Sequence, residues 1–202
     1  MAKLTYFDHA SLRIDARDGT TIYVDPFAPG DYTVPADIIL VTHDHFDHNQ
    51  TDMPAKKEGC RIITFADANK DGKYETYEIG NVKIEAVESY NKNHKKEACA
   101  GYIITVDGVS VYHAGDTSMT EQMSTFAARK LDYALLPMDG YYNMGFKEAA
   151  ECAAVIGAKH TIPIHTAPRS PEMKGITFSQ GIADRFDAPT KLVVQPGETI
   201  EL

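Results

Sequence analysis

Tryptophan is absent from the 202-residue sequence, and cysteine occurs only at Cys60, Cys99 and Cys152. Three widely spaced cysteines without a C-x-x-C pair argue against a disulfide scaffold and a thiolate zinc site, and we expect free thiols in a reducing compartment. No run approaches the roughly 18 apolar residues that a membrane-spanning helix needs, and we recognise no signal peptide. The sequence therefore predicts a cytoplasmic protein with no membrane partner.

Basic side chains are also in the minority, since 20 lysines and arginines face 29 aspartates and glutamates, for a formal net charge of −9. At this charge a polyanion is repelled at long range, which argues against a nuclease and predicts no nucleic-acid partner. Hydrophobic residues at 43% and charged residues at 24% are ordinary for a globular protein. We expect a single domain over residues 1–202, and the composition is compatible with a homo-oligomer.

The most informative stretch is residues 38–49, an apolar, β-branched run that ends abruptly in three histidines and two aspartates. The run predicts a buried strand, and the polar residues follow where that strand ends. His43 and His45 are two apart, so an extended backbone points both side chains to one side, and Asp47 and His48 follow after a turn. Imidazole and carboxylate together suit Zn²⁺, Fe²⁺ or Mn²⁺, so we interpret this as a metal site rather than a histidine-rich polar loop.

Three further expected strand ends carry metal-binding side chains. His94 lies in a loop after one strand, Asp116 follows another, and His165 follows a strand over residues 161–164. Strand ends that meet at one sheet edge would bring these loops to residues 43–48. Each residue also has an ordinary explanation, such as a helix N-cap for Asp116 and a hydrogen-bonded strand-end histidine for His165.

Hydrophobic patterning predicts the remaining elements. In the first half we expect strands over residues 4–7, 11–15, 20–24 and 61–65, hairpins closed at residues 80–81 and 107–108, a short helix within residues 50–60, and a turn rather than a calcium loop at residues 67–72. In the second half we expect helices over residues 121–129, 146–156 and 178–186, and strands over residues 131–137, 161–164, 192–194 and 199–201. Periodicity alone supports only an α/β fold.

The pattern H-x-H-x-D-H at residues 43–48 resembles the signature of the metallo-β-lactamase-fold superfamily. The surroundings of His94, residues 112–117 and the helix near Glu148 are similar to a branch of small bacterial metal-dependent hydrolases of unassigned substrate, related to ascorbate-6-phosphate lactonases. His9 resembles a histidine in the opening turn of these relatives, and Ser89 departs from their pattern. The resemblance implies an α/β fold of the four-layer αββα sandwich type.

The same resemblance implies two divalent ions, held by His43, His45 and His94 at one site, by Asp47, His48 and His165 at the other, and by Asp116 as a bridge. It implies a metal-dependent hydrolase that uses a metal-bridged hydroxide, with Asp47 and Asp116 as catalytic residues. Zinc is the favoured metal, and manganese or iron are alternatives. The alternative function is a non-hydrolytic redox or regulatory member of the fold, although diiron members typically carry an acid where this chain has His45.

The expected substrate is a small, anionic ester, lactone or phosphodiester. Three lysines flank His94, at positions 92, 95 and 96, and Arg169 follows His165, so positive charge could gather at the mouth of the site. Ordinary solvated lysines are the competing interpretation. Further candidates near the site are His113 and Tyr142, with Asp132 and Asp139 as residues that orient ligands.

Overall fold

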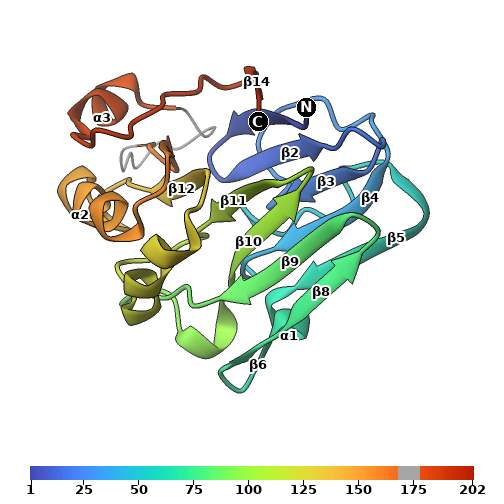
Figure 1. Ribbon diagram of the computed structural model, residues 1–202, viewed down its shortest axis with the longest axis horizontal. Coiled ribbons are helices and arrows are strands. Elements are labelled where there is room, and N and C mark those ends of the chain that lie inside the picture. Colours follow the sequence, from blue (N-terminus) through green and yellow to red (C-terminus); the bar gives the residue numbers. More distant parts are fainter. Residues whose placement is uncertain (168–177) are drawn as a thin grey trace.

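The computed structural model describes residues 1–167 and 178–202 and contains two six-stranded sheets (Figure 1). The first sheet has the order β14-β1-β2-β3-β4-β5, with β1 (Lys3–Asp8), β2 (Ser11–Asp15), β3 (Thr21–Val24), β4 (Ala36–Val41), β5 (Lys56–Thr64) and β14 (Thr199–Glu201). The second has the order β13-β12-β11-β10-β9-β8, with β8 (Thr76–Ile79), β9 (Val82–Val87), β10 (Gly101–Val106), β11 (Val109–His113), β12 (Tyr133–Pro137) and β13 (His160–Ile164).

The remaining elements are short, apart from one helix. They are α1 (Phe65–Ala68), α2 (Phe146–Ile156), α3 (Gln180–Arg185), the 3₁₀ helices η1 (Lys96–Ala98) and η2 (Glu121–Arg129), and the two-stranded pair β6 (Asn69–Lys70) and β7 (Lys73–Tyr74). Helix α2 has the predicted bounds because Gly157 takes the left-handed conformation that ends it, with φ 65°. Among the described residues, no helix combines the length and apolar character that crossing a membrane requires.

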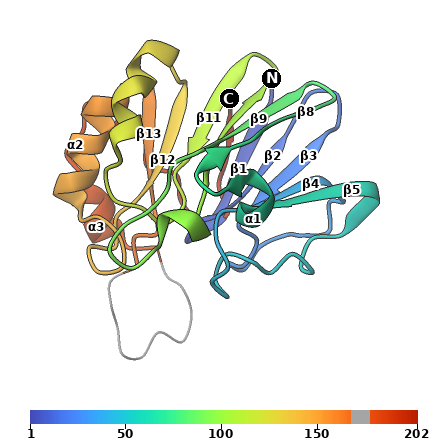
Figure 2. The ribbon, with the colours of Figure 1, turned by 90° about the horizontal axis from the view of Figure 1, so that it is seen from below.

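The two sheets pack face to face through alternating apolar side chains, and this packing forms the main core. Leu12, Ile22 and Leu40 from the first sheet and Ile104 and Leu135 from the second belong to one buried cluster. Figure 2 shows the sheets beside each other, with α2 and α3 outside the second sheet. The α/β sandwich that the motifs implied is confirmed.

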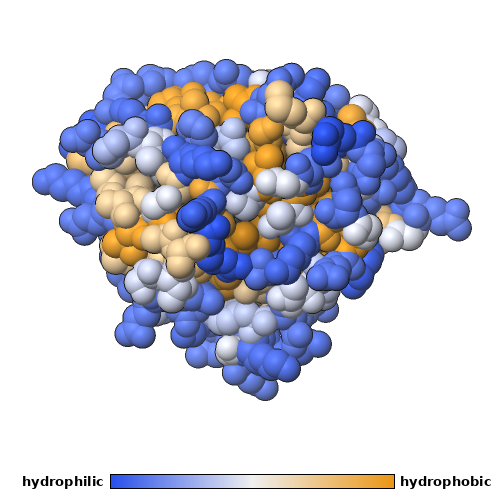
Figure 3. Space-filling view, in the orientation of Figure 1, coloured by the Kyte–Doolittle hydropathy of each residue, from blue (hydrophilic) through white to orange (hydrophobic). Residues whose placement is uncertain are grey.

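Each sheet also buries part of its outer face, whereas β5 and β8 remain largely exposed or half-buried. Helix α2 packs Ala149, Cys152 and Ile156 against a second apolar cluster that includes Leu136 of β12. On the first sheet, the loop of residues 25–35 provides the cover, since its Ala28 and Tyr32 pack against Phe7, Tyr23 and Ile39. Figure 3 shows hydrophilic residues around most of the rim of one face, with hydrophobic residues gathered toward its centre.

Strand direction sets where the chemistry lies. Strands β1, β3 and β4 run the same way in the first sheet, and β9, β11, β12 and β13 run the same way in the second. The carboxyl ends of these strands meet at one edge of the sandwich. A backbone hydrogen bond ties the two sheets together there, since the N–H of His165 donates to the carbonyl of His9 at 2.8 Å. Tyr102 adds a second tie, since its hydroxyl donates to the carbonyl of Val41 at 2.9 Å.

Two predicted elements are wrong and one is of a different type. Residues 50–60 form no helix, because β5 already begins at Lys56 and pairs in parallel with β4, so sheet pairing outweighs the local helix preference. Residues 192–194 form no strand, and this segment is joined to β13 only by an isolated bridge at Lys191 and the hydrogen bond from the N–H of Leu192. Residues 121–129 are helical as predicted, but the helix is 3₁₀.

Candidate metal centre

All seven predicted ligands lie together at the carboxyl ends of these strands. Their nitrogen and oxygen atoms form groups in which each atom lies within 4.8 Å of the others: His43, His45 and His94; His43, His48 and Asp116; and His9, Asp47, His48 and His165. We call His43, His45 and His94 the first group, and His9, Asp47, His48 and His165 the second group. The first group has the same members as one predicted ligand set, and the second group has those of the other with His9 added, so both sets stay predictions that the side-chain positions allow.

Asp116 lies between the two groups. Its Oδ2 is 3.4 Å from His94 Nε2 and 3.5 Å from His165 Nε2, while its Oδ1 is 3.5 Å from His48 Nε2. The carboxylate is buried, which raises its pKa, but the nearby histidines outweigh this and hold the pKa well below its ordinary value. Asp116 is thus an ionised group that faces histidines of both groups.

A close backbone approach positions Asp116. Gly115 has φ +64°, and a Cβ added there would lie 2.9 Å from Cβ of Thr42, so the chain can pass this point only with glycine. Thr117 then joins this loop to the loop that carries His94, because its hydroxyl donates to the carbonyl of Tyr90 at 3.1 Å. The Gly-Asp-Thr sequence therefore sets Asp116 between two strand ends.

Three histidines are hydrogen-bonded through their Nδ1 atoms, and a fourth, His165, has its Nδ1 within ion-pair distance of a carboxylate. His43 Nδ1 lies 3.1 Å from Thr42 Oγ1, and His94 Nδ1 lies 2.9 Å from Asn91 Oδ1. His48 Nδ1 lies 2.8 Å from Asp25 Oδ2 and His165 Nδ1 lies 3.2 Å from Asp139 Oδ2, which completes the set. Outer oxygens of this kind fix the tautomer and ring orientation of metal-binding histidines.

A metal ion fits this donor set. His48 Nε2 and Asp116 Oδ1 are buried and make no hydrogen bond with the protein, and buried polar atoms without partners cost free energy. An ion coordinated by both atoms would satisfy both. The chemistry of the set, imidazole with carboxylate and no thiolate, suits Zn²⁺, Fe²⁺ or Mn²⁺.

The histidines differ in charge. Burial and the neighbouring His48 lower the pKa of His43 to about 3, so His43 is neutral and can offer a lone pair. Burial also disfavours a charge on His48, but Asp116 and Asp25 outweigh it and raise the pKa of His48 to about 9. A metal ion that binds His48 must therefore displace a proton at neutral pH.

Three residues that the predicted ligand set did not include also support the site. His9 is buried, and its Nε2 lies 3.1 Å from Asp47 Oδ2 while its ring centroid is 3.6 Å from that of His165. Asp25 accepts hydrogen bonds from Thr42 as well as from His48. Asp139, which was only a candidate, stands beside His165. The Asp25-Pro26 pair before the motif was the available signal for Asp25.

Two other candidates, His113 and Asp132, lie outside the cluster. Both ring nitrogens of buried His113 are engaged by backbone, with Nε2 2.8 Å from the carbonyl of Ala10 and Nδ1 3.2 Å from the N–H of Gly115. Asp132 is wrong as an orienting residue, because it bonds to Ser110 and Lys159. Arg169 falls outside the described residues.

Two cavities open beside the cluster. The larger, of about 570 Å³, is lined by Asp44, His45, Phe46, Asp47, Asn93, His94, Asp116, Tyr142 and His165. The smaller, of about 260 Å³, shares His45 and His94 with it and adds Lys95 and the buried thiol of Cys99. Space of this size beside candidate metal ligands is suited to a small molecule.

Comparisons with known proteins agree with this geometry. A family model described as a Beta-lactamase superfamily domain matches residues 3–165. A UPF0173 metal-dependent hydrolase from Pyrococcus furiosus is 33% identical over 235 aligned residues, which cover 100% of both chains. A crystal structure described as a metal-dependent hydrolase from Parabacteroides distasonis has a TM-score of 0.76 and 30% identity, and the match covers 98% of this chain and 94% of that one.

The fold alone is shared more widely. A diiron β-hydroxylase from Streptomyces venezuelae has a TM-score of 0.71 at 17% identity, over 100% of this chain and 54% of that one. The family match over most of the chain and the full-length similarity to metal-dependent hydrolases confirm the resemblance seen in the motifs. The chain belongs to the β-lactamase superfamily, as a metal-dependent hydrolase.

Proposed function

We propose that this hydrolase binds two divalent ions, most favourably zinc, and acts on a small anionic ester, lactone or phosphodiester. The observation that carries the proposal is the position of Asp116, whose two oxygens face histidines of both groups. His43, His45 and His94 would hold one ion, Asp47, His48 and His165 the other, and Asp116 both. Two such ions would supply a water of lowered pKa and would polarise the scissile carbonyl or phosphoryl oxygen.

The protein's own groups divide the remaining work. Asp47 lies in the wall of the larger cavity, and burial raises its pKa, but the hydrogen bond from His9 and the nearby His48 outweigh this and lower it. Asp47 is therefore ionised and would bind metal as a carboxylate, whereas its lowered pKa makes it a weak proton acceptor. His113 is proposed to have no direct role, since both its ring nitrogens are bonded to backbone.

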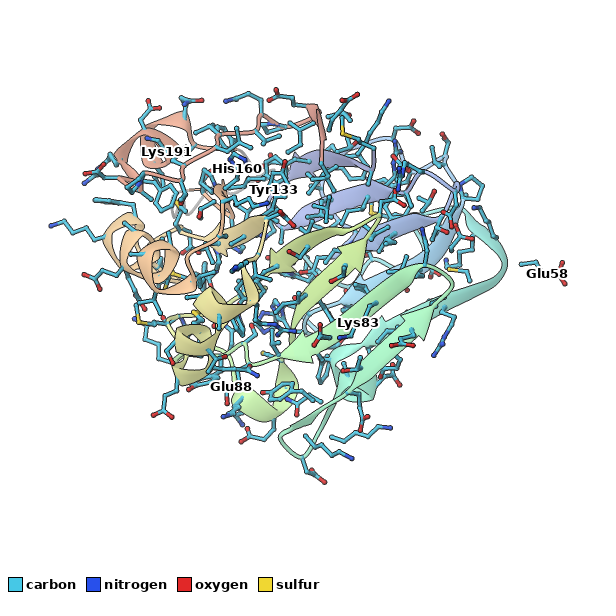
Figure 4. The ribbon with its side chains drawn as sticks, viewed as in Figure 1. Glu58, Lys83, Glu88, Tyr133, His160 and Lys191 are labelled. Carbon is cyan, nitrogen blue, oxygen red and sulfur yellow. The ribbon has the colours of Figure 1, made fainter. Side chains whose placement is uncertain are left out.

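The preference for a small substrate rests on the cavity and on charge. A cavity of about 570 Å³ suits a small molecule, and the chain's net charge of −9 disfavours a nucleic acid. Lys95 lines the smaller cavity and is the described lysine best placed to contact an anion. Lys96 pairs with Glu88, which follows β9 and is labelled in Figure 4, so Lys96 is already engaged.

The test is metal analysis of protein purified without chelator, followed by a panel of lactone, phosphodiester and thioester substrates. We expect close to two ions per chain, and hydrolysis that is lost on chelation and restored by zinc. Full activity with a single ion per chain would contradict the dinuclear proposal. Iron in both sites with oxygen consumption and no hydrolysis of the panel would favour the redox alternative instead.

A further inference from the structure

Two exposed aromatic side chains stand at the rim of the larger cavity. Phe46 is 71% exposed and Tyr142 is 47% exposed, although apolar rings of this size are normally buried. Both line the same cavity as His45, His94 and Asp116. They come from different sheets, because Phe46 follows β4 and Tyr142 follows β12. The rim therefore has one aromatic ring from each half of the sandwich.

The Phe46 side of the rim is braced. Gln50 Nε2 donates to the carbonyl of Phe46 at 2.7 Å, and the Phe46 ring meets Phe27 edge to face at 5.5 Å between centroids. The two residues that flank it, His45 and Asp47, belong to the two groups of metal-binding side chains. The exposed ring is thus fixed next to the place where chemistry is proposed.

On the Tyr142 side of the rim, both the backbone N–H and the backbone carbonyl of Tyr142 are hydrogen-bonded. Its N–H donates to Asp139 Oδ1 at 2.6 Å, and its carbonyl accepts from the side-chain amides of Asn91 at 3.0 Å and Asn93 at 2.8 Å. The ring meets that of Tyr141 edge to face at 4.7 Å. These bonds fix the Tyr142 backbone to the loop of His94 and to the aspartate beside His165, and the ring that it carries is half exposed.

We propose that Phe46 and Tyr142 form a subsite for an apolar acyl or aryl group next to the scissile bond, and the inference rests on the proposed function. Within the anionic esters and lactones proposed above, the acyl part is then that of an apolar carboxylic acid, and the negative charge lies on another part of the substrate. Water supplies a hydroxyl group to the acyl carbon and a proton to the departing oxygen, so the C–O bond breaks without an oxidant or a reductant. An apolar group that enters the cavity would cover both rings and remove their exposed area from water.

A substrate group explains this rim better than a partner protein does. The two rings line a concave cavity that also holds candidate metal ligands, whereas a protein partner needs a broad surface of roughly 800 Å² on each side. A small apolar group can contact both rings and leave its carboxyl carbon beside Asp116. The charged lining of Asp44, Asp47 and Asp116 then selects for the orientation in which the apolar end points outward.

The experiment measures binding of product-like carboxylates to the zinc-loaded full-length chain by calorimetry. Phenylacetate should bind about tenfold more tightly than acetate, because only phenylacetate carries a ring to cover Phe46 and Tyr142. Phe46→Ala and Tyr142→Ala should each reduce this preference at least about threefold, and Phe46→Leu should retain part of it. Zinc content should be unchanged in all three variants.

Val155→Ala is the matched control, since Val155 is an exposed apolar residue on α2, at 36% exposure, away from the cavity. It should keep the full preference. Equal binding of phenylacetate and acetate by the unmodified chain, or an undiminished preference in both alanine variants, would overturn the subsite. Binding of neither carboxylate would also overturn it, whereas the proposed function is tested independently by the metal count and the substrate panel.

Discussion

The two groups of candidate metal ligands differ in what holds their side chains. In the second group, His48 lies beside the carboxylate of Asp25, and His165 lies beside that of Asp139. Asp47 accepts a hydrogen bond from His9. In the first group, His43 and His94 are held by neutral oxygens, those of a threonine hydroxyl and an asparagine amide. His45 is exposed, with its Nδ1 3.0 Å from His43 Nε2.

This difference predicts unequal metal sites. A carboxylate that accepts from the outer nitrogen raises the basicity of a histidine and fixes its orientation, so the second group should bind its ion more tightly. The first group borders both cavities and contains the exposed His45, so its ion should exchange more readily.

Asp116→Ala should have the largest effect, because Asp116 is the residue proposed to serve both groups. We expect activity to fall by more than about a thousandfold, since several kcal/mol of charge stabilisation are removed with the metal geometry. Both binding steps should weaken in a chelator-competition titration with zinc. Loss of one ion with unchanged affinity for the other would refute the bridging role.

Asp25→Asn should separate the two groups. The change removes a charge that is hydrogen-bonded directly to His48, whereas the Thr42 hydroxyl, 2.7 Å from Asp25, stands between it and His43. The affinity of the tighter site should fall by about 10- to 100-fold, the usual range for outer partners of metal ligands, and that of the weaker site by less. Zinc titration resolves the two steps.

The matched control is Asp132→Asn, because Asp132 also accepts hydrogen bonds from a neighbouring backbone N–H and a hydroxyl but lies outside the cluster. It should leave both zinc affinities unchanged. If Asp25→Asn weakened both sites equally, the contrast between carboxylate-held and neutrally held histidines would lose its basis.

The contrast between Asp25, Asp139 and Asp132 also shows what the sequence could predict. The clustering of the candidate ligands of residues 43–48 was predictable because their spacing and the preceding apolar strand are local features. Asp139 follows β12 whereas Asp132 precedes it, so the rule that chemistry gathers at the carboxyl ends of parallel strands would have chosen correctly between them.

The contribution of His9 could not be predicted from local pattern. Its position depends on a left-handed backbone at φ 56° in the turn between β1 and β2, and on the second sheet delivering His165 against its ring. The missing helix in residues 50–60 has the same kind of cause, since pairing of β5 with β4 is a long-range event. Spacing along the chain carries no information about such contacts.

Asn91→Ala should have a smaller effect than Asp25→Asn, and it should act on the other metal site. Asn91 holds His94, which belongs to the first group. Removal of its amide oxygen, 2.9 Å from His94 Nδ1, should weaken the weaker zinc site by about tenfold. The tighter site should be unchanged. Asn91 also supports the loop of Tyr142, so the titration is read together with a melting curve, and a fall in the tighter step alone would reverse the proposed assignment of the two sites.

Lys95→Ala should have the smallest effect, because an exposed cation contributes little to binding through water. Lys95 lines the smaller cavity beside His94, so its loss should raise KM for anionic substrates by about two- to threefold and leave kcat unchanged, which is the pattern of lost ground-state binding. Lys96→Ala is the matched control, since Lys96 is paired with Glu88 and lies over the Tyr90 ring. If Lys95→Ala changed KM equally for anionic and neutral substrates, Lys95 would give no basis for an anionic preference. The metal ions would then be the proposed source of positive charge at the first group.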